Sequence, residues 1–384
     1  MIYIIHGADT QMLEPKISDE SNIGARMRST VVIAANLRSP HLPIWERLLA
    51  DEGVELLRFD THPRVTGIIS ALRFVFSLVR MRRTIHRMRR HGHEVLVQAH
   101  GAGRAGVLAT LLDSRPCVVV HGSEVLQARN RSYLFLRATA AVLSRSRSVI
   151  ITSEATRTEV LALTYRSPPR VTLFHPGIDW NAFAGAWVDR PSGSPQTLLS
   201  IRRVLPLYNI VEIIEAFQGL PMEIEANLTL LQGDVPPADN YLTGVRGMAA
   251  LDERIFLEDN FLDRAGLAEV YKNTDIALSL AQTDQLSSSI LEALGSGCVV
   301  IVSDLPAYAA LGRLTSLIRV PVPLSSLTLR AAIEDAMLLL AKPNERSGKA
   351  RHRRAVDARA AFESNHRAMK NLLDVIRSGD ASGA

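Results

Sequence analysis

One stretch of the chain, residues 278–306, carries the pattern that most constrains the fold. It reads LSLAQTDQLSSSILEALGSGCVVIVSDLP and combines an apolar run over 276–281, a polar turn, a helical segment over 286–295 and a second apolar run over 298–303. Continuous apolar runs of this length, bounded by Gly, Ser and Asp, are typical of buried parallel strands. We therefore predict one βαβ unit, in which a helix connects two parallel strands of a sheet.

Polar residues in the turn and on the helix of this unit form a candidate site. Asp284 lies in the turn, and Glu292 follows eight residues later, about two helical turns further along the same face. Ser287, Ser288 and Ser289 stand between them at a helix N-terminus, where unpaired N–H groups and the helix dipole favour an anion such as a phosphate. The plainer alternative is that Asp284 is only a helix N-cap and Glu292 a solvated helix residue.

Length and composition limit the class of protein. A chain of 384 residues is long enough for two substantial cores, and a content of 47% hydrophobic and 22% charged residues is typical of a folded soluble protein. Cys117 and Cys298 fall in predicted buried strands, so we expect reduced core thiols in a cytoplasmic protein and no cysteine-based metal cluster. We expect neither a secretion signal nor a membrane-spanning helix, because no basic region with a long apolar segment opens the chain and no run of eighteen apolar residues occurs.

Residues 64–90 form a strongly basic segment in a chain of net charge +5, with eight arginines and no acidic residue. Apolar residues recur in it at helical spacing, at Ile69, Leu72, Phe76, Val79, Ile85 and Met88. A basic amphipathic helix is typical of a membrane-surface element, because each Lys or Arg near an anionic leaflet contributes about 1 kcal/mol. The alternative is an ordinary helix packed on the sheet with a solvated basic face. Nucleic acid is not an expected partner, since no aromatic stacking platform accompanies the charge.

Two further motifs follow predicted strands of the first half. The strand 94–99 leads into residues 101–106, GAGRAG, which match the dinucleotide fingerprint G-x-G-x-x-G but do not stand in the first βα turn, where that fingerprint belongs. The strand 117–120 leads into His121, at the carboxyl end of a parallel strand, where open α/β sheets bind ligands. A lone histidine at such a position is also compatible with a purely structural role.

The composition changes at residues 184–196, AGAWVDRPSGSPQ, whose Pro, Gly and Ser content is that of a linker. Two series of alternating strands and helices, joined there, predict two doubly wound α/β domains facing a cleft. The expected parts are an N-terminal extension or arm, two Rossmann-like domains, and a C-terminal helix with a disordered tail, at 1–28, 29–185, 186–352 and 353–384.

Several of these segments resemble elements of the retaining GT-B glycosyltransferases, in particular glycosyltransferase family 4. Asp284 and Glu292 resemble the E-x₇-E element of that family, with Asp in place of the first Glu. The string from His121 to Glu124 is similar to the family's HGSD-type turn, with Glu in place of Asp, and residues 171–183 are similar to its P-N-G-V-D-x-x-x-F segment. In that segment, Pro176 stands where the family has Asn.

The segment after the predicted strand 197–201 resembles the family's G-R-x-x-x-x-K-G element, whose Arg and Lys clamp the donor diphosphate. Arg203 takes the Arg position, Arg202 replaces the Gly, and Tyr208 replaces the Lys. A cation is therefore missing where the charge of the leaving group must be neutralised, and Arg202 or the helix N-terminus is the expected compensation.

The resemblance implies a GT-B fold whose last helix crosses back onto the first domain. It also implies a role for each candidate residue. His121 contacts the donor sugar, and Asp284 binds its hydroxyls as it is transferred. The phosphates are held by Arg203, Arg202, Ser287, Ser288 and Ser289, the ribose is bound by Glu292, and the segment before the nucleobase pocket contains Asn260, Phe261 and Leu262. No metal and no cofactor are expected, because arginine and a helix terminus take the place of a metal.

The implied function is the retaining transfer of a sugar from a UDP- or GDP-sugar donor to a saccharide acceptor. Together with the basic segment, it suggests a lipid-linked acceptor in bacterial surface polysaccharide biosynthesis, at the inner face of the membrane. Two alternatives stay open: a sugar-nucleotide epimerase of the same fold, and a non-catalytic descendant that binds a membrane or a partner. The missing Lys and the shortened acid at Asp284 favour the second of these.

Overall fold

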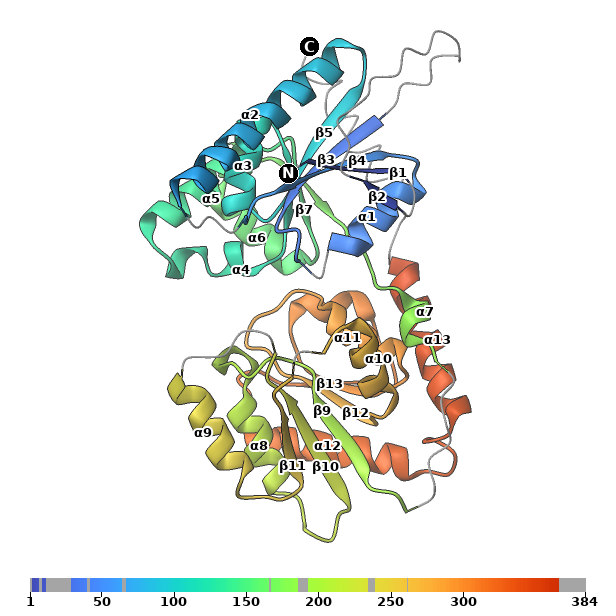
Figure 1. The fold of residues 1–384 in the computed structure, drawn as a ribbon. Coiled ribbons are helices and arrows are strands. Elements are labelled where there is room, and N and C mark those ends of the chain that lie inside the picture. The colour runs from blue at the N-terminus through green and yellow to red at the C-terminus, as the bar shows by residue number, and fades with distance from the viewer. Residues whose placement is uncertain are drawn as a thin grey trace. The chain divides into compact units, whose positions relative to one another are not determined.

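The computed structural model describes residues 2–6, 9–11, 29–39, 42–63, 67–165, 167–185, 193–233, 239–260 and 262–365. The chain divides into two compact units, one of Met1–Pro176 with Arg367–Ala384 and one of Gly177–His366. Each unit has its own sheet and its own core (Figure 1). The division after Pro176 lies before the expected linker at 184–196, of which residues 186–192 are outside the described ranges.

The sheet of the first unit has the strand order β2-β1-β4-β3-β5-β6-β7-β8. From β4 to β8 all neighbours are parallel, with Val32 opposite Leu57 on one side and opposite Val97 on the other. The strands are β1 (Ile2–His6), β2 (Asp9–Gln11), β3 (Ser29–Ala35), β4 (Glu55–Asp60), β5 (Glu94–His100), β6 (Cys117–Val120), β7 (Ser148–Ile151) and β8 (Arg170–Leu173). Continuous burial of β3, β6 and β7 explains why these segments read as unbroken apolar runs.

The N-terminal residues, expected to form an extension or arm, add strands to this sheet. β1 pairs antiparallel with β4, from Ile2 opposite Phe59 to Ile5 opposite Leu56, and β2 pairs antiparallel with β1. Residues 12–28 of the expected arm lie outside the described part of the chain.

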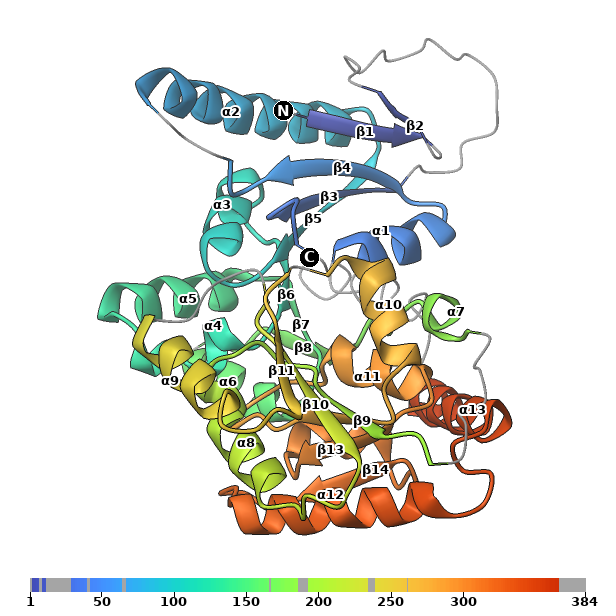
Figure 2. The same ribbon diagram turned by 60° about the horizontal axis from the view of Figure 1, so that its bottom comes forward.

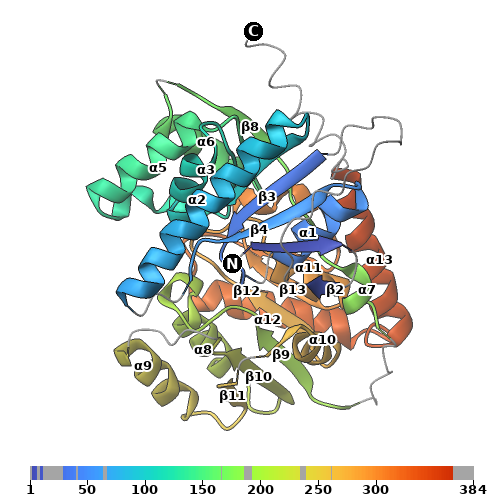
Figure 3. The ribbon, with the colours of Figure 1, turned by 45° about the horizontal axis from the view of Figure 1, so that its top comes forward.

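Helices cover both faces of the first sheet, as Figure 2 shows for α1 and α2. Trp45 and Leu49 of α1 pack with Val31 and Ile33 on one face, because alternate residues of β3 point to opposite sides. The helices α2, α3 and α5 pack on the other face, where α2 lies alongside α3 (Figure 3). The helices are α1 (Leu42–Asp51), α2 (Ile68–Arg90), α3 (Arg104–Leu112), α4 (Ser123–Leu126), η1 (Ala128–Asn130), α5 (Tyr133–Arg145) and α6 (Glu154–Leu163).

The second unit has a fully parallel sheet in the order β11-β10-β9-β12-β13-β14. Its strands are β9 (Gln196–Ser200), β10 (Ala226–Leu231), β11 (Ile255–Glu258), β12 (Ile276–Ser279), β13 (Val299–Ser303) and β14 (Leu317–Val320). Its helices are α7 (Trp180–Phe183), η2 (Pro206–Tyr208), α8 (Ile210–Gln218), α9 (Asp239–Ala249), α10 (Arg264–Lys272), α11 (Ser288–Gly295), η3 (Pro306–Leu311), α12 (Ser326–Ala341) and α13 (Gly348–Asn365). Residues of α8, α9 and α12 pack on one face, and those of α7, α10, α11 and α13 on the other. Two doubly wound α/β units are thus confirmed.

The predicted βαβ unit is confirmed as β12, α11 and β13. β12 pairs in parallel with β13, from Ile276 opposite Val299 to Ser279 opposite Val302. The helix begins at Ser288 rather than near residue 286, because Ser287 caps it and its Oγ accepts the Ser289 N–H at 3.2 Å.

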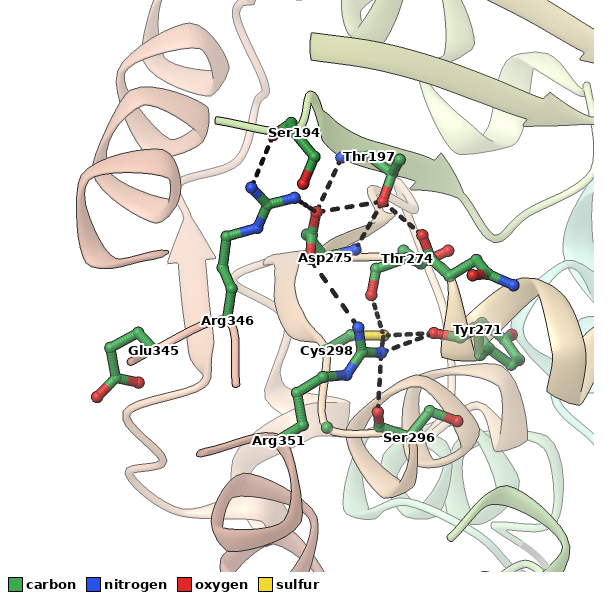
Figure 4. Close-up of polar contacts among 12 residues, drawn as sticks. Ser194, Thr197, Tyr271, Thr274, Asp275, Ser296, Cys298, Glu345, Arg346 and Arg351 are labelled. Atoms are coloured by element: carbon green, nitrogen blue, oxygen red, sulfur yellow. Dashed lines mark hydrogen bonds and ion pairs between the residues drawn. The ribbon is translucent and has the colours of Figure 1, made fainter. Parts of the chain in front are cut away.

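A buried ionic network fixes α13 to the second sheet (Figure 4). At the start of β12, Asp275 accepts from Arg346 at 2.9 Å, and Arg351 Nη1 lies 3.9 Å from its second oxygen. Arg351 Nη2 also donates to the carbonyl oxygens of Tyr271 and Ser296, at 2.9 and 3.1 Å. The network therefore places a cation at the C-terminal end of α11, where the helix dipole favours it.

The predicted crossing of the last helix back to the first domain concerns residues 353–384, of which residues 366–384 lie outside the described ranges. The described part of α13 packs on α11 and η3 of its own unit. In the part of the chain that the structure describes, no helix is both long and apolar enough to cross a membrane.

Candidate active site

The carboxyl edge of the second sheet gathers polar side chains from three neighbouring connections. Arg202 follows β9, Asp284 follows β12, and Tyr308 lies in η3 after β13. The carboxyl ends of neighbouring parallel strands meet at one edge, which is where open α/β sheets bind their ligands.

Asp284 is the centre of this cluster. Its Oδ2 accepts from Arg202 Nη2 at 2.8 Å and from the Tyr308 hydroxyl at 2.9 Å. Arg202 also donates to Ser287 Oγ at 2.5 Å, and its guanidinium carbon lies 4.5 Å from the centre of the Tyr208 ring. Burial raises the pKa of Asp284, although Arg202 and Tyr308 both favour its charged form. Asp284 is therefore not the N-cap of α11. It connects its own loop to the loops that carry Arg202 and Tyr308.

The two adjacent arginines have different environments. Arg202 and Asp284 are largely buried, with side chains 11% and 15% exposed, whereas Arg203 is exposed. Arg203 lies over Gly233 at the carboxyl end of β10: a Cβ added to Gly233 would stand 2.5 Å from Arg203 Cγ. Tyr208, in the position where the related motif has Lys, supports Arg202 with its ring instead of supplying a second cation.

Glu292 stands on α11 and is half-buried. Burial raises the pKa of its carboxyl group to about 7, against the opposing positive charge of Arg264. Among the described residues, none donates a hydrogen bond to this carboxylate. The Tyr271 hydroxyl, whose pKa is raised by burial and then by the charge of Glu292, donates to the Ser289 carbonyl oxygen at 3.4 Å. A buried carboxylate without a protein donor is suited to accept hydrogen bonds from a ligand.

Of the three residues expected near a nucleobase, Asn260 and Leu262 lie at the same edge of the second sheet. Asn260 is exposed after β11, and its N–H donates to the Glu258 carboxylate at 3.0 Å, while Leu262 is half-buried. Phe261 lies outside the described residues.

His121 stands at the carboxyl end of β6 in the first unit. The backbone N–H of His121 donates to Glu124 Oε1 at 2.8 Å, and Glu124 also accepts from the backbone N–H of Ala102. This carboxylate therefore joins the loops after β5 and β6. Burial raises the pKa of Glu124 in spite of these bonds. The His121 ring lies 5.6 Å from the His100 ring, and burial lowers the pKa of His121 to about 4. The imidazole is therefore neutral at pH 7 and able to donate or accept a hydrogen bond.

The glycines of residues 101–106 have a packing role. Gly101 has a φ of +107°, a conformation that favours glycine. A Cβ on Gly106 would stand 2.6 Å from Val142 Cγ1, so this glycine allows α3 to approach α5. The match to the dinucleotide fingerprint is thus explained by backbone turn and helix packing.

Sequence patterns do not single out Tyr308 or Tyr271 as site residues. Tyr308 follows a predicted strand at the carboxyl edge, and this position is the sequence signal that could have marked it as a site residue. Tyr271 looks like any apolar residue of an amphipathic helix, and the importance of Gly233 depends on a long-range contact with Arg203. Within the described residues, no group of three or more His, Cys, Asp or Glu side chains is placed to hold a metal ion.

Two doubly wound units, each with six consecutive parallel strands, define the class of fold as GT-B, the fold of a large group of glycosyltransferases. Sucrose-phosphate synthase from Thermosynechococcus elongatus matches with a TM-score of 0.68 and 16% identity over 93% of this chain and 100% of that chain. HepE from Anabaena, in complex with UDP, matches with a TM-score of 0.65 and 14% identity over 92% of this chain and 100% of that chain. Trehalose 6-phosphate synthase from Burkholderia multivorans matches with a TM-score of 0.63 and 13% identity over 92% of this chain and 97% of that chain.

Identities of this size show the fold alone. No protein-family model matches the sequence, and no curated protein sequence matches it. The side chains at the carboxyl edge of each sheet carry the information on activity.

Proposed function

We propose that this protein is a retaining glycosyltransferase that transfers a sugar from a UDP- or GDP-sugar to a saccharide acceptor. The observation that carries the proposal is Glu292, a half-buried carboxylate without a protein hydrogen-bond donor among the described residues, on the helix that begins at Ser288. Similar folds support the choice of donor, since one solved structure contains HepE from Anabaena with UDP-glucose.

Each part of the donor has a candidate partner. The Glu292 carboxylate would accept hydrogen bonds from the ribose hydroxyls. The N-terminus of α11 and Arg203 would stabilise the diphosphate as it departs, through N–H groups and positive charge, so that no divalent metal is needed. Asp284, oriented by Arg202 and Tyr308, would bind hydroxyls of the transferred sugar. From the first unit, the neutral imidazole of His121 would form a hydrogen bond to that sugar.

The reaction is a substitution at the anomeric carbon. The bond between this carbon and the phosphate oxygen breaks, the acceptor oxygen forms a bond to the same carbon, and the acceptor proton passes to the departing phosphate. Attack from the face that the diphosphate leaves retains the anomeric configuration. Charge develops on the phosphate in this step, which is why donors arranged in advance at the α11 N-terminus would lower the barrier.

The proposed acceptor is a lipid-linked saccharide of bacterial surface polysaccharide biosynthesis, reached from the inner face of the membrane. The support is α2, whose N-terminal half exposes a stripe of apolar side chains: Ile68, Ile69, Leu72, Val75, Phe76 and Val79. Ile85 and Met88, expected in the same stripe, instead pack into the core of the first unit. The exposed stripe is followed by Arg80, Arg82, Arg83 and Arg87 on a helix without acidic residues, a combination suited to an anionic lipid surface.

The donor assignment can be tested by calorimetric titration of UDP and GDP into the parent protein and into Glu292→Ala. Two charged hydrogen bonds to a ribose are worth about 1.5 to 3 kcal/mol each, so the variant should bind at least ten times more weakly. Glu269→Ala, which removes an exposed acid from α10, is the matched control and should bind as the parent does. Equal binding by the parent and Glu292→Ala would remove the basis of the proposal.

A further inference from the structure

Two exposed arginines, Arg104 and Arg131, stand at the carboxyl edge of the first sheet. Arg104 is the first residue of α3, which follows β5, and Arg131 directly precedes Ser132, the N-cap of α5. The Arg131 guanidinium carbon lies 4.7 Å from the centre of the Phe135 ring. A Cβ added to Gly103, the N-cap of α3, would stand 3.6 Å from Cε2 of the same ring. The first turn of α5 thus packs against the start of α3, and both arginines belong to one part of this edge.

The stability of the two helices does not explain these positions. The dipole of a helix disfavours a cation at its N-terminus, and the first turns of α3 and α5 contain no acidic residue that would offset one. At the other end of α5, Arg145 stands where the dipole favours a cation. Arg104 and Arg131 therefore add charge to two helix ends that are already partly positive.

Ion pairs do not neutralise these two arginines within the described part of the chain. Arg129, in the preceding helix η1, pairs with Glu159 at 3.6 Å. Neither Arg104 nor Arg131 forms such a pair with a described residue. The charge of Arg131 acts on Glu124, but burial acts more strongly and raises the pKa of this carboxyl group, which already accepts from backbone N–H groups. The positive charge at this edge is therefore available to an anion.

The charge of Arg104 also reaches the loop after β4. Strands β4, β3 and β5 are parallel neighbours, and the ends of β4 and β3 are level, with Asp60 opposite Ala35. Burial, and then the positive charge of Arg104, lower the pKa of His62, whereas Asp60 opposes them more weakly. At His62, the charge of Arg104 therefore outweighs that of the acid in the same loop.

We propose that Arg104 and Arg131 bind a phosphate group of the acceptor. This inference rests on the proposed function, to which it adds that the acceptor is phosphorylated. Guanidinium groups donate paired hydrogen bonds that match the oxygens of a phosphate, and the two helix N-termini favour the same negative charge. The phosphate belongs either to a soluble sugar phosphate or to the diphosphate that joins a saccharide to a lipid carrier.

The test is a calorimetric titration of glucose 6-phosphate and of farnesyl diphosphate into the full chain, with saturating UDP to occupy the proposed donor site. In Arg104→Gln/Arg131→Gln we expect the dissociation constant of at least one probe to rise by about tenfold or more. The probe that the parent binds more tightly identifies the source of the phosphate. The proposal is overturned if the parent binds neither probe, or if the variant binds both as the parent does.

The matched control is Arg115→Gln/Arg145→Gln. It removes the same charge from exposed positions at the amino edge of the same sheet and should bind both probes as the parent does. All four side chains are exposed, so thermal unfolding of the two variants should match that of the parent. Should the first variant unfold, Arg104→Gln alone takes its place in the same comparison. Equal losses of affinity in variant and control would show a general effect of charge and would contradict the proposal.

Binding of UDP, measured in parallel, separates this proposal from the proposed function. Both arginines belong to the first unit and the candidate donor site to the second, so Arg104→Gln/Arg131→Gln should bind UDP as the parent does. Unchanged binding of UDP together with unchanged binding of both probes overturns the phosphate site and leaves the proposed function intact. A parent that does not bind UDP contradicts the proposed function, whereas probe binding that depends on Arg104 and Arg131 still supports the phosphate site.

Discussion

The Arg202 guanidinium donates to the Asp284 carboxylate at 2.8 Å, across 82 residues of sequence and between the ends of two adjacent strands. Both side chains are largely buried, and Tyr308 and Ser287 complete their hydrogen bonds. The pair thus fixes the loop before α11, and with it the N-terminus of the helix that is proposed to face the donor phosphates.

Removing Arg202 should destabilise the protein, because it leaves Asp284 buried without its cation. We expect Arg202→Met to lower the free energy of unfolding by about 3 kcal/mol, measured by urea denaturation. Arg330→Met, which breaks the more exposed pair with Glu334 at 2.9 Å, should cost less than about 1 kcal/mol. Similar losses in the two variants would mean that the Arg202–Asp284 contact does not stabilise the site.

Glu292 should make stability depend on pH. Its pKa is raised by burial from 4.5 to about 7, so the folded protein binds its proton more tightly than the unfolded chain does. The stabilisation is complete below pH 4.5 and is lost as the pH rises to 7, by about 3 kcal/mol. Glu292→Gln should therefore be more stable than the parent at pH 8 and little different at pH 4.5, as measured by denaturation at each pH. An unchanged pH profile in Glu292→Gln would contradict this.

Gly233 should tolerate no side chain. A methyl group there would meet Arg203 at 2.5 Å, and the φ of +85° adds backbone strain. Gly233→Ala should cost about 1 to 3 kcal/mol and should displace Arg203, which would weaken UDP binding. Gly244→Ala in α9, where nothing lies within 4 Å of the added methyl, should instead stabilise by about 0.5 to 1 kcal/mol. If both substitutions have the same effect, Arg203 is not held over Gly233.

The stripe on α2 predicts binding to anionic vesicles, measured by flotation. Leu72→Ser/Phe76→Ser should bind less than the parent, because the two side chains are 64% and 67% exposed and would rest in the lipid. Tyr133→Ser/Leu134→Ser, which removes equally exposed apolar groups from α5, should bind as the parent does.

Electrostatic attachment through the α2 arginines has its own signature. Binding should weaken when salt rises from 0.1 to 1 M, as the Debye length falls from about 10 to about 3 Å. It should also weaken when Arg80, Arg82, Arg83 and Arg87 are replaced by Gln. Equal binding to neutral and anionic vesicles, or no change in these variants, would leave α2 as an ordinary helix with a solvated basic face.

The sequence predicts this fold well where local pattern and burial agree. Residues 117–120 form a strand with the predicted bounds, since this apolar run is limited by Pro116 and His121. Periodicity alone did not show which part of α2 packs on the sheet, and the structure buries Ile85 while exposing Phe76. It also did not distinguish Arg202 from its neighbour Arg203, because that difference depends on contacts with Asp284 and Gly233, which lie far away in sequence.

The most direct test of the account is to incubate the parent protein and Glu292→Ala with UDP- and GDP-sugars and a saccharide acceptor, in EDTA, and to follow the products by NMR. A retaining, metal-independent glycosyltransferase releases the nucleoside diphosphate and forms a new glycosidic bond with the donor's anomeric configuration, and Glu292→Ala should do so much more slowly. Conversion of the sugar nucleotide into its epimer, reversible inhibition by EDTA, or no turnover of any donor by a protein that still binds vesicles would contradict the account.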